Sequence, residues 1–513
     1  MTDTAQNNKR IAKNTMFLYA RMGIIMLVQL YTSRIVLNAL GVKDYGIYNI
    51  VGSIIVAFNF ISIPLSTATQ RFYNYELGKN NIENVNKIFN LSLIIYGLIA
   101  ITLICIVEIC GLWFINNKMS LPQTRIDAAL WTFHCSVFVF AISLLRNPFE
   151  SLIVAHEKMS VYAYIGIIDA VLKLLNAFSL MYFTTDKLKL YAVNQLIIAI
   201  VGFVIIFYYN RKKLGYIKIK RVYDKEMFKN LLSFSGWSLF GSVAVMLSNQ
   251  GLNILLNIFY GVAVNAAMGI ATQVNASIQQ FVGNFQVAFR PQIVKQFSAN
   301  QLASLRNLVT NSSKYSFLLL FCIVCPLLFN ISFILKVWLG NVPKYAPEFC
   351  ILMMIYALSE SLSAPMWMTI QATGKIKKYQ IIISCVMAMN IVLSYIFLDM
   401  GFKPIIVLII KCCLDLCYLI IRLLFINKMI KFSIKKYIRN VCFPLSIIVL
   451  LTSTSILIVQ HYINDGWFRM FISIIVFGII FIPSTYYICL NNKEKIMIKT
   501  FIINKLTLYK KNG

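Results

Sequence analysis

The chain has 513 residues, 59% of them hydrophobic, and its mean hydropathy is +0.74. This composition excludes an array of soluble domains, because such domains contain only about 45–50% apolar residues. The formal net charge is +30, with 48 Lys and Arg against 18 Asp and Glu, so the distribution of charge decides whether nucleic acid is a plausible partner.

Apolar runs long enough to cross a bilayer recur from one end of the chain to the other. A hydrocarbon core about 30 Å thick requires roughly 20 helical residues. None of the runs alternates in polarity as a β-barrel strand does. We therefore predict an all-α polytopic membrane protein with about fourteen transmembrane helices. The predicted spans are 14–36, 46–70, 89–114, 128–146, 160–183, 190–209, 231–258, 263–289, 314–335, 347–371, 379–398, 405–426, 440–460 and 470–490. The first run is too long for a signal peptide and has no cleavage pattern, which favours a retained helix.

The basic residues are distributed unequally between the two sides of the predicted membrane. The connections on the side of the N-terminus contain 34 Lys and Arg, and those on the other side contain 9. By the positive-inside rule, both termini of this multi-pass protein are cytoplasmic. Most of the positive charge therefore sets orientation, and we expect no nucleic-acid partner.

The longest basic connection, at 211–230, divides the predicted helices into two sets of six. We predict an N-terminal lobe at 1–210, a cytoplasmic linker at 211–230, a C-terminal lobe at 231–430, and two extra helices with a basic tail at 431–513. An even number of helices per lobe relates the lobes by a pseudo-two-fold axis along the membrane normal. Residue matches support an internal repeat: Pro148, Lys158 and Tyr162 recur 217 positions later, and Leu37, Asn38 and Arg71 recur 219 positions later.

Two neighbouring spans carry stripes of uncharged polar side chains. The stripe of the seventh span contains Ser235, Ser238, Ser242, Asn249, Asn253 and Asn257, and that of the eighth contains Asn265, Thr272, Asn275, Gln279 and Gln286. At about 100° per residue, each stripe occupies one helix face. Two interpretations remain open: hydrogen bonds between helices, or a hydrated wall that binds a polyhydroxylated ligand through groups that both donate and accept. The candidate binding residues are Asn249, Asn253, Thr272, Asn275 and Gln279.

Charged side chains within the spans form a second set of candidates. Arg21 lies about 10 Å into the first helix, where its fork suits an anionic substrate. Arg34 lies near the outer end of that helix, about 220° around it from Arg21, so a straight helix cannot direct both into one cavity. Lys173 is central in the fifth span.

The remaining intramembrane charges suggest local pairing or coupling. Asp169–Lys173 and Lys411–Asp415 have the i, i+4 spacing of pairs that neutralise themselves. Glu108 and Glu360 have no partner nearby in sequence and are candidates for proton coupling. Three arginines near predicted inner ends are interpreted as snorkelling to the interface, namely Arg71, Arg290 and Arg422.

The sequence offers little support for an enzyme or a metal protein. Twelve cysteines lie mostly inside spans and the chain has three histidines, so we expect no metal site and no cofactor. Every outer connection is short, and no Asp, Glu and His cluster supplies a general base.

The opening segment resembles a known family. "NTMFLYARMGIIMLVQLYTSRIVLNALGVKDYGIYNIVGSI", residues 14–54, is similar to the start of bacterial polysaccharide flippases, the O-antigen and capsule exporters of the multidrug/oligosaccharidyl-lipid/polysaccharide superfamily. The resemblance implies translocation of undecaprenyl-diphosphate-linked oligosaccharide across the inner membrane by alternating access. It implies that cations of the first lobe meet the diphosphate, with Arg21, Arg34 and Lys173 as the candidates. Membrane lipids, a glycan polymerase and other assembly proteins are the implied partners.

Three alternatives remain. The first is a cation-coupled multidrug extruder of the same superfamily. Its usual intramembrane carboxylates are missing, because no Asp or Glu occurs between Asp3 and Asp44 or between Glu226 and Glu348. A membrane glycan polymerase or glycosyltransferase is the second, and a membrane scaffold that does not transport is the third.

Overall fold

The computed structural model describes residues 3–56, 58–118, 123–183, 186–215, 218–220, 224–490 and 494–495. Within these ranges the chain is helical and contains no strand. The helices are α1 (Asp3–Val56), α2 (Asn59–Gly78), α3 (Ile82–Lys118), α4 (Ile126–Ala155), α5 (Met159–Tyr182), α6 (Lys187–Lys213), α7 (Lys225–Tyr260), α8 (Val262–Ser298), α9 (Leu302–Phe329), α10 (Ile331–Leu339), α11 (Ala346–Thr373), α12 (Lys377–Asp399), α13 (Ile406–Ile430), α14 (Ile434–Tyr437), α15 (Phe443–Tyr462) and α16 (Trp467–Ser484). Three short elements complete them: η1 (Gln123–Arg125), η2 (Ile438–Cys442) and η3 (Thr485–Cys489). The predicted all-α polytopic fold class is confirmed.

Eleven segments of the described chain are long and apolar enough to cross a membrane. The three other predicted spans also coincide with helices. The span at 46–70 is divided between α1 and α2, α8 carries the amide stripe, and α13 carries Lys411, Asp415 and Arg422. These interruptions and polar residues lower the apolar character of the three segments without preventing helix formation.

The structure divides into two compact units, which are described separately. Unit 1 comprises Met1–Leu247, Asn284–Leu305 and Met368–Cys385, and unit 2 comprises Ser248–Gly283, Arg306–Trp367 and Val386–Gly513. Unit 1 thus contains the six N-terminal helices, most of α7 up to Leu247, the end of α8 with the start of α9, and the junction of α11 with α12. The turns within these added segments, at 299–301 and 374–376, lie on the side that the charge distribution predicts to be cytoplasmic.

Unusual backbone angles recur at matching positions of the two halves. Gly41 and Gly261 have φ of 74° and 75°, Asn80 and Asn300 have 58° and 57°, and Glu157 and Gly374 have 58° and 76°. The first two pairs are 220 residues apart and the third is 217 apart, close to the spacings of the sequence repeat. Positive φ disfavours most side chains, so its recurrence at three pairs of helix ends indicates that both halves have the same succession of helices and turns.

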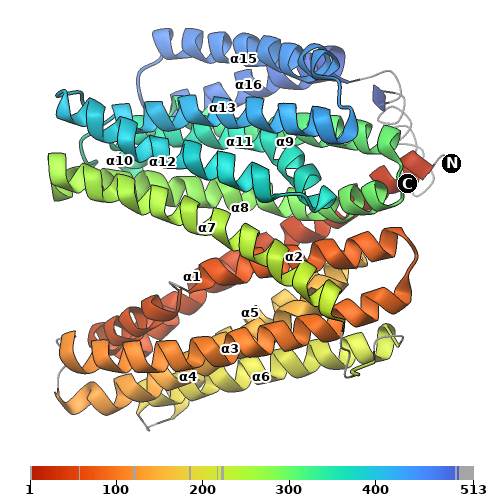
Figure 1. The fold of residues 1–513 in the computed structure, drawn as a ribbon. Coiled ribbons are helices and arrows are strands. Elements are labelled where there is room, and N and C mark those ends of the chain that lie inside the picture. Colours follow the sequence, from red (N-terminus) through yellow and green to blue (C-terminus); the bar gives the residue numbers. More distant parts are fainter. Residues whose placement is uncertain are drawn as a thin grey trace, which may run out of the picture. The chain divides into compact units, whose positions relative to one another are not determined.

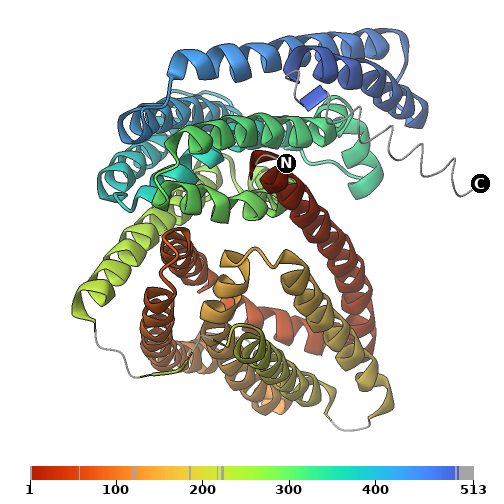
Figure 2. The same cartoon turned by 90° about the vertical axis from the view of Figure 1, so that its right-hand side faces the viewer.

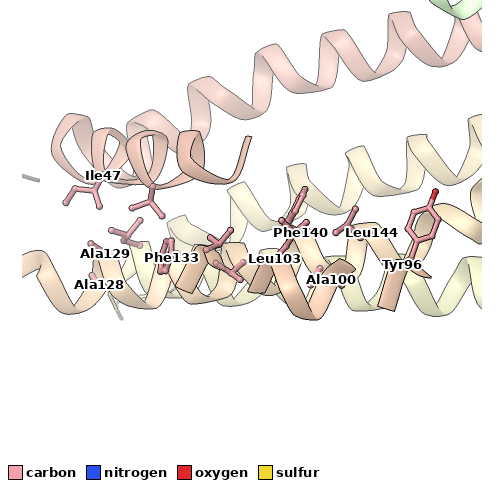
Figure 3. Close-up of a cluster of buried hydrophobic side chains, with 14 of the residues drawn as sticks. Ile47, Tyr96, Ala100, Leu103, Ala128, Ala129, Phe133, Phe140 and Leu144 are labelled. Atoms are coloured by element: carbon pink, nitrogen blue, oxygen red, sulfur yellow. The ribbon is translucent and has the colours of Figure 1, made fainter. Parts of the chain in front are cut away.

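The core of unit 1 lies mainly between α3 and α4. Phe133, Leu144 and Tyr96 are almost completely buried there (Figure 3), and the Tyr96 hydroxyl lies 3.3 Å from Oγ1 of Thr69 on α2. Figure 1 shows α3, α4 and α6 running side by side. Apolar faces on neighbouring helices therefore hold this bundle together.

An ion-pair cluster joins three segments at the predicted outer end of unit 1. Arg125, at the start of α4, pairs with Asp44 of α1 and with Asp186, where its Nη1 lies 2.7 Å from Oδ2. Asp186 also caps α6 by accepting from the backbone N–H groups of Leu188 and Lys189. Asp44 follows the break of α1 at Gly41, so this acidic residue of the predicted outer link fixes the return of the chain.

In unit 2, the C-terminal helices pack against α9. The ring of Phe321 on α9 lies 5.9 Å from that of Phe477 and 6.1 Å from that of Phe481, both on α16. Figure 2 shows α15 and α16 next to each other at one edge of this unit. Lys314 Nζ on α9 donates to the Cys489 carbonyl at 3.0 Å, which ties the end of η3, directly after α16, to α9.

Candidate functional site

A cavity of about 380 Å³ lies in unit 1 between α1, α5 and α6, and we call it the central pocket. Its described lining includes Arg21, Gln29, Thr32, Ser33, Tyr45, Tyr48, Gly166, Asp169, Lys173, Tyr191 and Gln195. The volume lies within the range of small-molecule sites. Two of the three predicted first-lobe cations, Arg21 and Lys173, therefore line one cavity.

Arg21 is held in the central pocket by an aromatic ring and a glycine. Its guanidinium carbon lies 4.5 Å from the centroid of the Tyr162 ring, a cation–π distance. A Cβ on Gly166 would come within 2.4 Å of Arg21 Nε. That Nε is buried and has no hydrogen-bond partner in the described part of the chain. Glycine at position 166 therefore lets α1 and α5 approach closely with the arginine between them.

Arg146, which was not among the residues predicted from the sequence, lines an adjoining cavity of about 200 Å³ that Arg21 also lines. Arg146 Nε lies 2.6 Å from Oε1 of Glu150, and its Nη2 lies 2.7 Å from Oδ2 of Asp169. Gly202 makes room for this pair, because a Cβ there would lie 2.6 Å from Arg146 Nη1. The signal in the sequence was the Arg146–Glu150 spacing of four residues.

Arg146 determines which charged side chains of the central pocket remain available to bind a ligand. It pairs with both nearby carboxylates, and no salt bridge joins Asp169 to Lys173. The interpretation of Asp169–Lys173 as a self-neutralised pair is therefore wrong in this structure. Arg21 and Lys173 are left facing the cavity without a carboxylate ion pair among the described residues, an arrangement that suits an anionic ligand.

Arg34 lies outside the lining of the central pocket. It is exposed, whereas its neighbour Ser33 lines the cavity. Helix α1 has no non-helical residue between Arg21 and Arg34, since its break comes at Gly41. The 220° between the two arginines is therefore maintained, and the structure directs only the deeper one into the pocket.

In unit 2, the predicted amide residues have different surroundings. Asn249 Oδ1 accepts from Lys411 Nζ at 3.1 Å. The Thr272 hydroxyl donates to the Met268 carbonyl of its own helix. Asn253 and Gln279 are half-buried, and Asn275 has a buried Oδ1 that makes no hydrogen bond with the described residues. The amide stripes therefore include both hydrogen bonds between helices and groups that remain available.

The predicted coupling carboxylates both have partners. Glu108 Oε2 lies 2.9 Å from Nδ1 of His134, and Glu360 Oε1 lies 3.2 Å from Nη1 of Arg422. Arg422 is only 5% exposed and also contacts Ser363, so the prediction that it snorkels is wrong. Lys411 is bound by Asn249 and lies 4.7 Å from the Tyr356 ring centroid, and no salt bridge joins it to Asp415.

A group of contacts at the predicted cytoplasmic end of unit 1 joins segments of both sequence halves. Arg71 Nη2 on α2 donates to the Ala372 carbonyl in the last turn of α11 at 3.1 Å. Glu157 accepts from Lys295 Nζ of α8 at 2.9 Å and from Gln292 Nε2 at 3.2 Å. We call these contacts the inner latch. Arg71 engages a helix C-terminus, where a cation is favoured, so the prediction that this residue snorkels is also wrong.

The fold resembles that of known transporters. A mutant MATE protein gives a TM-score of 0.72 at 13% identity, with 83% of this chain and 96% of that chain covered. An outward-facing multidrug resistance MATE family transporter of the MOP superfamily gives 0.70 at 15% identity, with the same coverages. A MOP superfamily transporter from Pyrococcus furiosus, described as having a binding pocket of reversed polarity that suggests a different function, gives 0.69 at 14% identity, again covering 83% and 96%. The chain therefore has the fold of MATE transporters.

Sequence comparison gives a relative that matches part of the chain. The uncharacterized membrane protein EpsK of Bacillus subtilis is 20% identical over 308 residues, which is 60% of this chain and 60% of that protein. No protein-family model matches the chain.

Proposed function

We propose that the protein is a flippase that moves an undecaprenyl-diphosphate-linked oligosaccharide across the bacterial inner membrane by alternating access, for surface polysaccharide biosynthesis. The observation that carries the proposal is the pairing with Arg146 of Asp169, in the described lining of the central pocket, and of Glu150, in the adjoining cavity. Arg21 and Lys173 consequently face the cavity as cations that a diphosphate can neutralise. The similarity of residues 14–54 to polysaccharide flippases supports the same substrate.

The rest of the central pocket fits a large polar headgroup. Gln29, Thr32, Ser33 and Gln195 supply donors and acceptors beside the two cations. A sugar next to the diphosphate can exchange hydrogen bonds with them as it leaves water. The half-buried amides of unit 2 supply groups of the same chemistry.

The inner latch supports alternating access. Its contacts join α8 and α11 to the N-terminal helices. They are the Lys295–Glu157 ion pair, the hydrogen bond from Arg71 to the Ala372 carbonyl, and the hydrogen bond from the Gln292 amide to Glu157. Polar contacts of this kind can exchange their partners for water when they open, which a gate between two conformations requires. A permanently buried apolar core would resist that separation.

The second candidate is a multidrug extruder, since the solved structures of the same fold include multidrug transporters. An unpaired carboxylate would favour an organic cation, but Asp169 of the central pocket is paired with Arg146, as is Glu150 in the adjoining cavity. The pocket chemistry therefore favours the anionic substrate. A polymerase or glycosyltransferase gains no support from the central pocket, where no carboxylate is available as a base.

The proposal is tested in a strain that lacks the gene. We expect undecaprenyl-linked repeat units to remain on the cytoplasmic face and surface glycan to be lost. Wild-type protein and Arg34→Ala should restore the glycan, whereas Arg21→Ala at equal membrane abundance should not. Normal glycan with increased drug sensitivity in the deletion strain would contradict the flippase and favour the extruder.

A further inference from the structure

A second large cavity, of about 440 Å³, lies at the predicted cytoplasmic end of the N-terminal helices. We call it the inner-end cavity. Its described lining consists of Phe89, Phe149, Phe207, Asn210, Arg211, Gly215, Lys218 and Ile219. It shares no lining residue with the central pocket and is slightly larger. The proposed transport function therefore leaves this cavity without a role.

The floor of the inner-end cavity is aromatic and tightly packed. Phe89 and Phe149 are buried, with ring centroids 5.0 Å apart at an interplanar angle of 82°. Phe207 packs edge-on against Phe149 at 5.8 Å. Three phenylalanines from α3, α4 and α6 thus present an apolar surface that phosphate or sugar does not favour, but hydrocarbon does.

The roof of the cavity is a segment of the linker that two asparagines of α3 hold in place. Asn86 Oδ1 accepts from the backbone N–H of Lys218 at 3.0 Å, and Asn90 Oδ1 accepts from that of Lys220 at 2.8 Å. Asn90 Nδ2 also donates to the Lys218 carbonyl at 2.9 Å. Side chains thereby replace the secondary-structure partners that this extended segment lacks, and they place Lys218 at the cavity.

Polar groups are concentrated around Asn210 and the two basic residues. Asn210 is 1% exposed; its Nδ2 donates to the Ile206 carbonyl at 2.8 Å, while its Oδ1 is buried without a hydrogen-bond partner in the described residues. Arg211 and Lys218 are exposed, and the described lining contains no carboxylate. The cavity therefore combines one unused acceptor and two cations with an apolar floor.

We propose that the inner-end cavity binds an anionic phospholipid of the phosphatidylglycerol class. Its phosphate pairs with Arg211 and Lys218, a headgroup hydroxyl donates to Asn210 Oδ1, and the first acyl methylenes cover the phenylalanines. The cavity adjoins the end of a membrane-spanning helix whose last turn contains three basic residues, which is where anionic headgroups bind membrane proteins. Bound lipid fastens the linker to the N-terminal helices.

The proposal predicts saturable and headgroup-specific binding by the full-length protein. Purified protein in a neutral detergent is titrated with phosphatidylglycerol, and bound lipid is counted by native mass spectrometry while the thermal midpoint is followed. We expect a saturable rise in the midpoint with phosphatidylglycerol and none with phosphatidylcholine of the same chains. Arg211→Gln/Lys218→Gln removes both phosphate partners. It should raise the apparent Kd for phosphatidylglycerol at least about tenfold.

The matched control is Lys212→Gln/Lys213→Gln, which removes the same charge from the same helix end. Both lysines are exposed and do not line the cavity, so we expect wild-type binding. Asn210→Leu should reduce the preference for phosphatidylglycerol over phosphatidic acid. Equal binding of phosphatidylcholine, or equal losses in the two double variants, would overturn the proposal. An equal midpoint shift with inorganic phosphate or ATP would overturn the lipid assignment in favour of a soluble anion.

Discussion

At the residue scale, glycines determine where the arginines of unit 1 can lie. Gly166 and Gly202 leave space for Arg21 and Arg146, respectively. Neither glycine is in a conformation that requires glycine, so their role is close approach. Depth in the first helix predicted Arg21, but nothing in the local pattern of α5 predicted that residue 166 faces it. That Gly166 faces Arg21 depends on how α1 packs against α5, two helices that are far apart in sequence.

We expect Gly166→Ala to impair transport without loss of membrane abundance. The new Cβ would lie 2.4 Å from Arg21 Nε, so the guanidinium must leave its position over Tyr162. A loss of about 1–3 kcal/mol of substrate interaction corresponds to roughly 5- to 150-fold weaker substrate binding. Gly97→Ala is the control, since nothing lies within 4 Å of its Cβ position. Equal glycan export by both variants at equal abundance would contradict this prediction.

Arg146 lies at the predicted end of the fourth span, and this placement concealed its contacts inside the helix bundle. The predicted fourth span ends at residue 146, which places Arg146 and Glu150 at the predicted cytoplasmic connection. The structure extends α4 to Ala155, through Pro148. Proline often ends a helix because it removes a backbone donor, but neighbouring helices can compensate in a membrane protein. The charges therefore lie inside the bundle.

The Arg146 network should behave as a unit. Arg146→Gln leaves two carboxylates without their cation, so we expect destabilisation of about 1–3 kcal/mol. This is less than the cost of breaking a fully buried ion pair, because the three side chains are 14% to 26% exposed. In Arg146→Gln/Glu150→Gln/Asp169→Asn, which lacks all three charges, most of the stability should return. Thermal unfolding in detergent measures both effects. A triple variant as unstable as the single one would show that the charges are not coupled.

At the element scale, the turn between α4 and α5 connects the two sequence halves within unit 1. Glu157 has φ of 58°, and its carboxylate, 1% exposed, accepts from Gln292 and Lys295 of α8. The equivalent turn of the second half has Gly374, whose lack of a Cβ leaves room for Arg71. The sequence repeat predicted that the turns correspond. It could not predict that each engages a helix of the other half, because sequence spacing carries no information about such partners.

The same turn should be sensitive to pH through His156. Burial, with Lys295 and Lys158 adding repulsion, lowers the pKa of His156 from 6.5 to about 4. Between these values the unfolded chain binds a proton that the folded turn does not. Stability from this histidine is therefore fully present above about pH 6.5 and is lost as pH falls toward about 4.

We expect His156→Gln to reduce the fall in thermal midpoint between pH 7.5 and pH 5. Hydrogen exchange of residues 155–158 should show the same difference locally, because the wild-type turn opens more often as the imidazole becomes protonated. The control is His461→Gln, which changes an imidazole of unit 2, in the last turn of α15. Parallel pH dependence of wild type and His156→Gln would contradict the prediction.

At the scale of the whole molecule, hydropathy and charge patterning predicted the helices better than the site. The spans were predicted from long apolar runs. The bilayer requires such runs regardless of which helices pack against one another. The break at Gly41 fell within the expected link at 37–45. The network of Arg146, Glu150 and Asp169 joins α4 to α5. Asp169 is too far from the other two residues in sequence for a helical repeat to reveal the contact. Such partners depend on three-dimensional packing.

On the proposed function, transport by the whole molecule should depend on the charge of the substrate. In proteoliposomes with a fluorescent undecaprenyl-diphosphate-linked oligosaccharide, Arg21→Gln/Lys173→Gln should raise the half-saturating concentration about 10- to 100-fold, since each charged contact contributes about 1.5–3 kcal/mol before losses to solvent. Higher ionic strength should weaken uptake by wild type more than by the double variant, because salt screens the interactions that the variant lacks. The control is Arg34→Gln, which removes an exposed cation outside the central pocket. If all three proteins responded equally to salt, the anion-binding role of Arg21 and Lys173 would be excluded.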